Sequence, residues 1–157
     1  MSSNHDFMRR AIALATEAIG ADRGGPFGAV IVRDGQIIAE GTNQVTSEND
    51  PTAHAEMVAI RAACRALGSF SLAGAEIFSS CEPCPMCLGA IYWARLDRLW
   101  FANSRADAAA IGFDDAHIYT EIALPIAARA IPTAQLLADE ARAAFAEWAA
   151  NPDKTTY

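Results

Sequence analysis

Basic side chains are scarce in this chain. Lys and Arg together number 12 among 157 residues, against 19 Asp and Glu, and the formal net charge is −7. The basic residues are scattered, and only Arg9 and Arg10 are adjacent. An acidic surface repels phosphate backbones, whereas a dedicated nucleic-acid binder usually presents a basic patch. The composition therefore argues against a polynucleotide substrate, and we expect no nucleic-acid partner.

Long apolar runs are also absent. Although 52% of the residues are hydrophobic, no stretch approaches the roughly 20 uninterrupted apolar residues that a membrane helix needs. The first ten residues lack the basic-then-apolar pattern of a secretory signal. We therefore expect a cytoplasmic protein with no membrane partner. The length and apolar content suit a single domain, residues 1–157, with a substantial core.

The four cysteines are unevenly distributed. Cys81, Cys84 and Cys87 fall within seven residues, whereas Cys64 stands apart in a segment that is expected to be helical. Without a secretory signal, such clustering favours metal binding over a disulfide framework. Cys64 fits the role of a small core residue.

Hydrophobic periodicity predicts an α/β fold. Strands are expected over residues 27–32, 36–40, 75–80 and 98–102, and the Asp34-Gly35 turn should join the first two. Residues 131–136 suit either a short fifth strand or the start of the last helix. The order of the elements suggests a mixed sheet that is covered by helices on both faces.

Helices are expected over residues 6–19, 51–67, 85–94 and 138–149. Asp6 should lie near the N-cap of the first helix. Asp50 should cap the second helix, with Pro51 in its first position. Ser104 and Asp107 have capping-box spacing ahead of a further short helix.

The informative motif joins His54-Ala55-Glu56 to Pro83-Cys84-Pro85-Met86-Cys87. Each half alone is weak, since a Cys-x-x-Cys pair can also be a redox pair. Together they provide one imidazole and two thiolates near the starts of two helices. Three protein ligands leave one position of a tetrahedral zinc for water, which is typical of a catalytic site. Cys81 could be a fourth ligand, but at the end of a strand its thiol need not face the metal.

Glu56 stands two residues from the His54 ligand. Zinc lowers the pKa of bound water to about 7, and a neighbouring carboxylate can accept the proton and so leave a zinc-bound hydroxide. The same carboxylate can then deliver protons to a ring nitrogen and to a departing amine. This H-x-E and P-C-x-x-C combination is typical of zinc-dependent deaminases that act on nucleobases. A surface charge is the simpler alternative for Glu56.

The whole chain resembles the cytidine deaminase superfamily, and within it the small zinc-dependent guanine deaminases of bacteria. The segments that carry this resemblance are residues 24–32, Asn43, 49–56, 81–95, 112–115, 118–122 and Tyr157. It implies a three-layer α/β/α fold with a five-stranded mixed sheet. It also implies a homodimer that holds one zinc ion per subunit and exchanges a C-terminal segment, about residues 131–157, between its subunits.

The resemblance further implies hydrolysis of a C–N bond in a cyclic amidine, namely of guanine to xanthine and ammonia, with Glu56 as proton shuttle. Phe27 and the His54 ring would sandwich the purine, Asn43 would hydrogen-bond it, and Asp115 and Tyr157 would read its imidazole side. The remaining expected contacts are Ala55, Trp93 and Glu121.

Each of these contacts has a simpler alternative. Asn43 could cap the loop after the second strand, and Phe27 could belong to the core. Asp115 could cap a helix. Glu121 could be a solvated charge, and Tyr157 could be a disordered end.

Other functions also fit the zinc motif. A tRNA adenosine deaminase shares it, but the net charge of −7 and the Phe113-Asp114-Asp115 and Tyr157 features argue against that function. Cytosine, cytidine, guanosine and small-triazine deaminases are further alternatives. A zinc-binding scaffold without activity would be expected to lack Glu56.

Overall fold

The structure of the chain is a computed structural model that describes residues 3–157. The chain divides into two compact units, one that ends at Asp115 and one that runs from Ala116 to Tyr157. Over residues 3–157, no helix has both the length and the apolar character that crossing a membrane would require.

The first unit is built on a four-stranded mixed sheet with the strand order β2-β1-β3-β4. The strands are β1 (Gly28–Arg33), β2 (Gln36–Thr42), β3 (Ala75–Cys81) and β4 (Arg98–Asn103). β1 pairs antiparallel with both β2 and β3, whereas β3 and β4 are parallel. This confirms the predicted α/β class and the four earlier strands.

The prediction of a fifth strand is wrong. Residues 131–136 form neither a strand nor a helix, so the sheet has four strands. Pro132 lies in this segment and cannot donate a ladder hydrogen bond, which weakens any strand there. The apolar side chains of the segment imitate a strand pattern, but its unit contains no other strand with which it could pair.

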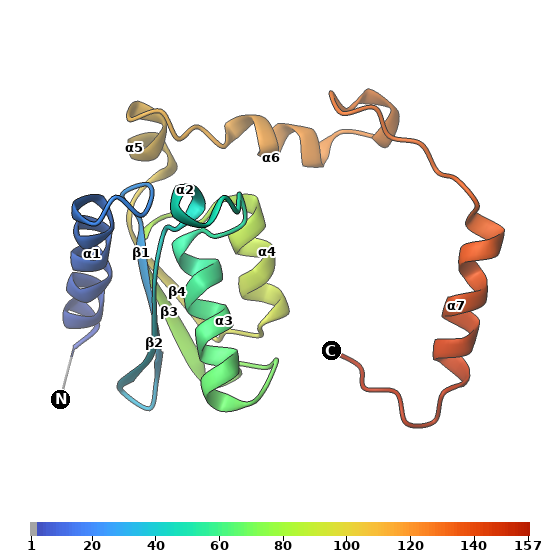
Figure 1. Cartoon of the computed structure of the whole chain (residues 1–157), viewed down its shortest axis with the longest axis horizontal. Coiled ribbons are helices and arrows are strands. Elements are labelled where there is room, and N and C mark those ends of the chain that lie inside the picture. Colours follow the sequence, from blue (N-terminus) through green and yellow to red (C-terminus); the bar gives the residue numbers. More distant parts are fainter. Residues whose placement is uncertain (1–2) are drawn as a thin grey trace. The chain divides into compact units, whose positions relative to one another are not determined.

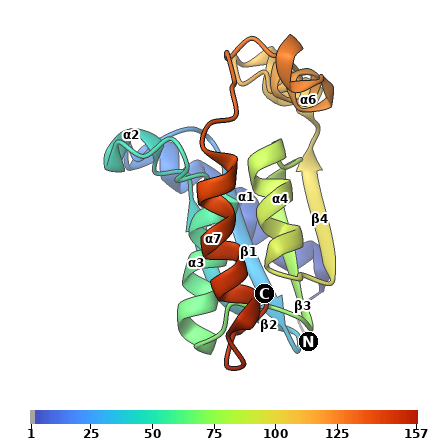
Figure 2. The same cartoon turned by 90° about the vertical axis from the view of Figure 1, so that its right-hand side faces the viewer.

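Helices cover both faces of the sheet. α1 (Asn4–Gly20) lies on one face, and α3 (Ala55–Leu67) and α4 (Pro85–Trp93) lie side by side on the other (Figures 1 and 2). Successive side chains along a strand point to opposite faces of the sheet, so the strands contribute to two separate cores. Val30 and Phe78 pack with α1, and Ile31 and Ile77 pack with the α3 and α4 side.

The start of α3 differs from expectation. The predicted cap at Asp50 is wrong, because the Asp50 carboxylate instead accepts hydrogen bonds from the Thr52 N–H and hydroxyl at 2.8 and 2.7 Å. This closes a tight turn just after the short helix α2 (Val45–Glu48). The backbone at His54 is extended, and His54 becomes the N-cap of α3.

The other helix ends largely follow the sequence. Ser3 caps α1 and Asp6 completes the capping box three residues later, so Asp6 lies near the N-cap as predicted. Ser104 and Asp107 form the predicted capping box at the start of α5 (Arg105–Ala110). Gly68 ends α3 in the left-handed conformation, with φ 61°.

Two glycines let helices approach the sheet closely. A Cβ atom at Gly28 would lie 2.3 Å from the Ala11 carbonyl oxygen of α1, and one at Gly41 would lie 2.2 Å from the Ala55 carbonyl oxygen of α3. No side chain fits at those distances. The backbones of α1 and α3 therefore contact the two strands directly.

The second unit contains α6 (Ala116–Ala123), a 3-10 turn (Ile126–Ala128) and α7 (Ala138–Ala150). α7 confirms the helix predicted over residues 138–149. None of these helices has a buried residue. Large apolar side chains are exposed along the unit: Ile131, Leu136, Leu137, Phe145 and Trp148. The unit therefore lacks a core of its own.

Candidate metal centre and active site

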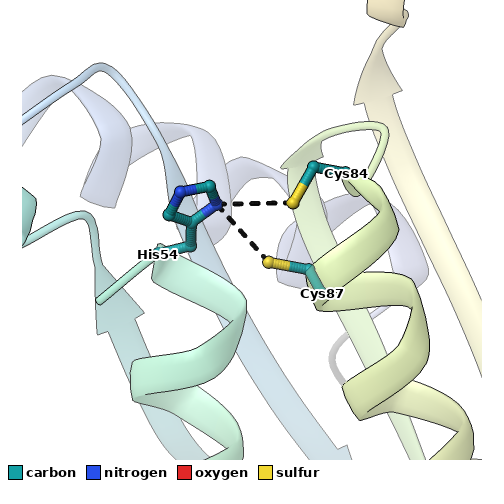
Figure 3. Close-up of side chains that lie close together, drawn as sticks. All are labelled: His54, Cys84 and Cys87. Atoms are coloured by element: carbon teal, nitrogen blue, oxygen red, sulfur yellow. Dashed lines mark hydrogen bonds between the residues drawn. The ribbon is translucent and has the colours of Figure 1, made fainter. Parts of the chain in front are cut away.

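Two helix starts bring the cysteines and the histidine together. His54 is the N-cap of α3, Cys84 is the N-cap of α4, and Cys87 lies in the first turn of α4. Pro85 fits the first position of α4, since its fixed φ suits a helix and its missing N–H would have no partner there. The close-up shows the His54 ring directed at both sulfur atoms (Figure 3).

The geometry of this group fits zinc. The Nδ1 atom of His54 lies 3.6 Å from the Sγ atoms of both Cys84 and Cys87, and the three ligand atoms lie within 4.8 Å of one another. Tetrahedral zinc with ordinary bond lengths would separate a nitrogen and a sulfur ligand by about 3.5 Å. In residues 3–157, this is the one group of three or more potential ligands found at such spacing.

The pKa shifts of the two thiols also favour a metal site. A hydrogen bond from Cys87, assisted by His54, lowers the pKa of Cys84 to about 4, so that Cys84 is a thiolate at neutral pH. The Cys84 thiolate, together with burial, raises the pKa of Cys87. A divalent cation held by Cys84 and Cys87 would neutralise both charges and remove the penalty of ionising Cys87.

Cys81 does not join the group. Its Sγ atom faces the Ser104 carbonyl oxygen at 3.7 Å, and its side chain is buried at the end of β3. Burial raises the pKa of Cys81 to about 11, so it stays a neutral thiol. Three protein ligands therefore remain, which leaves a fourth tetrahedral position for water.

Glu56 lies in the first turn of α3 and is only 6% exposed. One carboxylate oxygen, Oε2, lies 3.5 Å from the Cys87 Sγ, and the other, Oε1, accepts a hydrogen bond of 3.2 Å from the Ser79 hydroxyl. Burial raises the pKa of Glu56, as does the negative charge of Cys84. Glu56 is therefore a buried acid–base group beside the metal ligands, and Ser79 is a contact that motif reasoning missed.

Asn43 and Phe27 lie together next to the Gly24-Gly25 turn. The Asn43 N–H donates to the Phe27 carbonyl at 3.1 Å. The Asn43 Oδ1 accepts from the N–H groups of Gly25 and Val45 at 3.2 and 3.1 Å. Asn43 therefore caps the loop, as its simpler alternative predicted. These bonds also fix the orientation of the amide, so that Nδ2 is the group it can offer to a ligand.

The other expected contacts in the first unit are Ala55, Asp115 and Trp93. Ala55, which is fully buried, follows His54 at the start of α3. Asp115 is half-buried, and burial raises its pKa, opposed by the charge of Arg105. Trp93 ends α4, nine residues after Cys84, and thus about 13 Å away along the helix axis. Its predicted contact with the substrate stays a prediction.

Glu121 and Tyr157 belong to the second unit. The Glu121 Oε2 accepts the N–H of Ala130 at 2.7 Å, so this carboxylate helps to hold its own unit together. Tyr157 is the C-terminal residue and is 69% exposed. Their predicted contacts with a purine stay predictions.

Comparison with known proteins identifies the family. The model of the cytidine and deoxycytidylate deaminase zinc-binding region matches residues 1–103, which include every residue of the His54, Cys84 and Cys87 group. The chain belongs to this deaminase family. The matched region is a zinc-binding region, and the group of His54, Cys84 and Cys87 is positioned to hold a metal ion.

Among known deaminases, guanine deaminase from Bacillus subtilis is 53% identical over 98% of this chain and 99% of its own length. The X-ray structure of guanine deaminase from Bacillus subtilis superposes with a TM-score of 0.97, 51% identity and 99% coverage of both chains.

Two other deaminases match a smaller part of the chain. Guanine deaminase from Nitrosomonas europaea gives a TM-score of 0.69 at 35% identity, over 73% of this chain and 66% of its own. A tRNA-specific adenosine deaminase from Agrobacterium fabrum is 45% identical over 64% of this chain and 66% of its own length.

Proposed function

We propose that this enzyme hydrolyses guanine to xanthine and ammonia. The observation that carries the proposal is the near-complete match, at 53% identity, to the guanine deaminase of Bacillus subtilis. The tRNA deaminase match covers only 64% of the chain, whereas the guanine deaminase match covers 98% and so includes most of the second unit. The acidic net charge of −7 also favours a small substrate over RNA.

In the proposed reaction, a C–O bond forms at the ring carbon that carries the amino group, and the C–N bond to that group breaks. Zinc, when bound, supplies Lewis-acid activation of water at neutral pH. Glu56 takes the proton of the attacking water and then delivers it to the adjacent ring nitrogen. The proton of the newly added hydroxyl group then passes through Glu56 to the departing amine, so that guanine and water are converted to xanthine and ammonia.

We propose that Asn43 and Phe27 hold the purine. With its Oδ1 occupied by the Gly25 and Val45 N–H groups, Asn43 acts toward the base as a donor only. A donor selects a ring nitrogen or carbonyl acceptor and would be left unpaired against a base that lacks one. Phe27 packs edge-on against Phe113, with ring centroids 4.9 Å apart, which steadies it as a face for the base. Asp115 and Ala55 would complete the site.

The substrate is tested by incubating zinc-loaded protein separately with guanine, adenine, cytosine, guanosine and a tRNA, and measuring ammonia. We expect release from guanine and none from tRNA. Release from tRNA or cytosine without release from guanine would overturn the proposal and favour the corresponding deaminase.

We also propose a homodimer in which the C-terminal segment, about residues 131–157, packs on the neighbouring subunit and brings Tyr157 to its site, with Glu121 and Trp93 as further contacts of the substrate. Two observations support this. The helices of the second unit have no buried residue, and Leu136 and Phe145 are 82% and 78% exposed. In the first unit, Tyr92 and Trp93 are 76% and 66% exposed at the end of α4. Apolar surfaces of this kind gain stability from a partner.

The exchange can be separated from closure within one subunit by complementation. Glu56→Gln chains keep Tyr157, and chains that lack Tyr157 keep Glu56. When the two variants are unfolded together and refolded as mixed dimers, exchange predicts that activity returns in the site that combines both residues. No recovery in mixed dimers, with a mass of twice 16.7 kDa by light scattering, would contradict exchange.

A further inference from the structure

Ser79 is a polar residue in a buried strand. It lies in β3, is 2% exposed, and is paired in register with Ala29 on one side and Phe101 on the other. Alternation along the strand places Ser79 on the same face as Ile77, whose neighbours are the apolar residues under α3 and α4. A hydroxyl in such a place needs a partner, because an unpaired buried hydroxyl costs free energy.

The partner of this hydroxyl is the Glu56 carboxylate. The Ser79 Oγ donates to Oε1 of Glu56 at 3.2 Å, and both side chains are buried. The two carboxylate oxygens thereby have different neighbours, since Oε2 lies 3.5 Å from the Cys87 Sγ. Oε1 is therefore held by a residue of the sheet, and Oε2 faces the metal ligands.

The terminal torsion of a glutamate is soft, so packing alone does not fix the plane of a carboxylate. A hydrogen bond from a buried strand hydroxyl does fix it, and a bond to a charged acceptor is stronger than a neutral one. Because β3 is paired on both sides, the donor itself cannot easily move.

We propose that Ser79 is a positioning residue for the deamination, which holds Oε1 of Glu56 so that Oε2 points at the reacting water. This role rests on the proposed function of Glu56 as proton shuttle. Ser79 contacts neither substrate nor metal in this role. It acts through the orientation of the Glu56 carboxylate.

The test compares Ser79→Ala with Ser79→Thr and with Ser80→Ala. Ser80 is a matched control, since it is a buried serine on the opposite face of the same strand, whose Oγ accepts the Gly28 N–H at 3.0 Å. For each variant, zinc content, kcat and KM are measured on the base that the parent enzyme deaminates fastest. The Ser79→Ala variant should show about a tenfold lower kcat with KM changed less than about twofold and zinc retained.

Ser79→Thr should recover most of the kcat, because it keeps the hydroxyl, and Ser80→Ala should keep the parent kcat per zinc. An unchanged kcat in Ser79→Ala would overturn the proposal. Crystal structures give a readout that is independent of activity. The Glu56 carboxylate should rotate or adopt two orientations in Ser79→Ala, and an unchanged orientation would also overturn the role. Parent enzyme that is active on another base but not on guanine would contradict only the substrate assignment.

Discussion

Glu56 offers the most direct residue-scale test of the chemistry. We expect Glu56→Gln to keep zinc and to lose turnover by about 10²–10⁴-fold, because an amide has a similar shape but cannot carry the proton. Metal analysis and ammonia release from guanine measure the two properties on the same sample. Glu76→Gln is the control, since Glu76 bonds the Trp100 indole on the opposite face of β3. Parent-like turnover in Glu56→Gln would refute the shuttle.

Zinc stoichiometry tests the assignment of the three cysteines. Cys81→Ala should still bind about one zinc ion, because its thiol faces a carbonyl oxygen, and should lose only about 1 kcal/mol of stability. Cys87→Ala should bind almost none under the same dialysis. Loss of zinc from Cys81→Ala, with its fold intact by circular dichroism, would make Cys81 a ligand.

The sequence alone predicted a group of three possible metal ligands because the residue types in two short motifs, rather than their tertiary contacts, indicate the chemistry. His54, Cys84 and Cys87 each lie at or just inside a helix start, and the chemistry requires those residue types. The contact between Ser79 and Glu56 joins positions 23 residues apart on different elements. Nothing in its local pattern identifies it, except a serine within an otherwise apolar strand.

At the scale of elements, the close contact between β2 and α3 is the one most sensitive to a single methyl group. Gly41→Ala would place a Cβ atom 2.2 Å from the Ala55 carbonyl oxygen and 2.6 Å from the Ala59 nitrogen. We expect a loss of at least about 2 kcal/mol in urea unfolding, with weaker zinc binding, because α3 carries His54 and Glu56.

Gly89→Ala is the matched control for this prediction. Gly89 lies inside α4, and a Cβ atom added to it would have no neighbouring atom within 4 Å, so alanine should stabilise the helix by about 0.5–1 kcal/mol. Equal stability of the Gly41→Ala variant and the parent would show that α3 can move away from β2 without cost.

The ion pair between α1 and β2 gives a pH prediction. Arg10 binds both carboxylate oxygens of Glu40, at 2.7 and 2.6 Å, and these hydrogen bonds lower the pKa of Glu40. A carboxylate whose pKa is lowered by folding stabilises the folded protein at pH values above its pKa in the unfolded chain, about 4.3. This stabilisation is lost as the pH falls through the pKa of the folded state.

Because the pair is more than a third exposed, Glu40→Gln should cost no more than about 1 kcal/mol at pH 7. The difference from the parent should shrink toward zero below about pH 4 and in 1 M salt. Glu48→Gln, at an exposed carboxylate, serves as control. A difference that grows on acidification would exclude the pair as its source.

The elements were predicted well where periodicity is strong, and less well at their ends. The start of α3 was misplaced because Asp50 and Pro51 have the composition of a helix start, yet the Asp50 side chain is used by Thr52 in a turn. Likewise, residues 131–136 were predicted as a strand from their apolar side chains, but their own unit contains no strand with which they could pair. A local pattern cannot reveal which partner a side chain or strand finds.

For the whole molecule, zinc should act as a cross-link between two helices. His54 and the two cysteines come from segments 30 and 33 residues apart, so bound metal favours the folded chain. With free zinc at a thousand times its Kd, the gain is about 4 kcal/mol. Since each kcal/mol shifts the Tm of a chain of this length by about 2–4 °C, a chelator should lower the Tm by roughly 10 °C.

Cys84→Ser is the control for this measurement, because it should already lack the metal. Its Tm in scanning calorimetry should be the same with and without chelator. A parent Tm that does not respond to a chelator that has removed the zinc would mean that the helices are held without it.

The division of the chain into two units could not be read from the sequence. The Ala-rich segment predicts α7 correctly, since alanine favours helices wherever they pack. Helix propensity does not say what covers the helix, and Phe145 and Trp148 remain exposed within their own unit.

The convergence of two helix starts on the metal ligands also sets the local electric potential. Zinc with two thiolates and a neutral imidazole carries no net charge. The N-termini of α3 and α4 each add a partial positive charge from their free N–H groups. In a protein with a net charge of −7, the charges of the two thiolates would thus be balanced by the metal and the two helix starts, without any lysine or arginine among the ligands. A negatively charged group that binds beside these helix starts would be stabilised by their partial positive charges and opposed by the Glu56 carboxylate, 3.5 Å from the Cys87 Sγ.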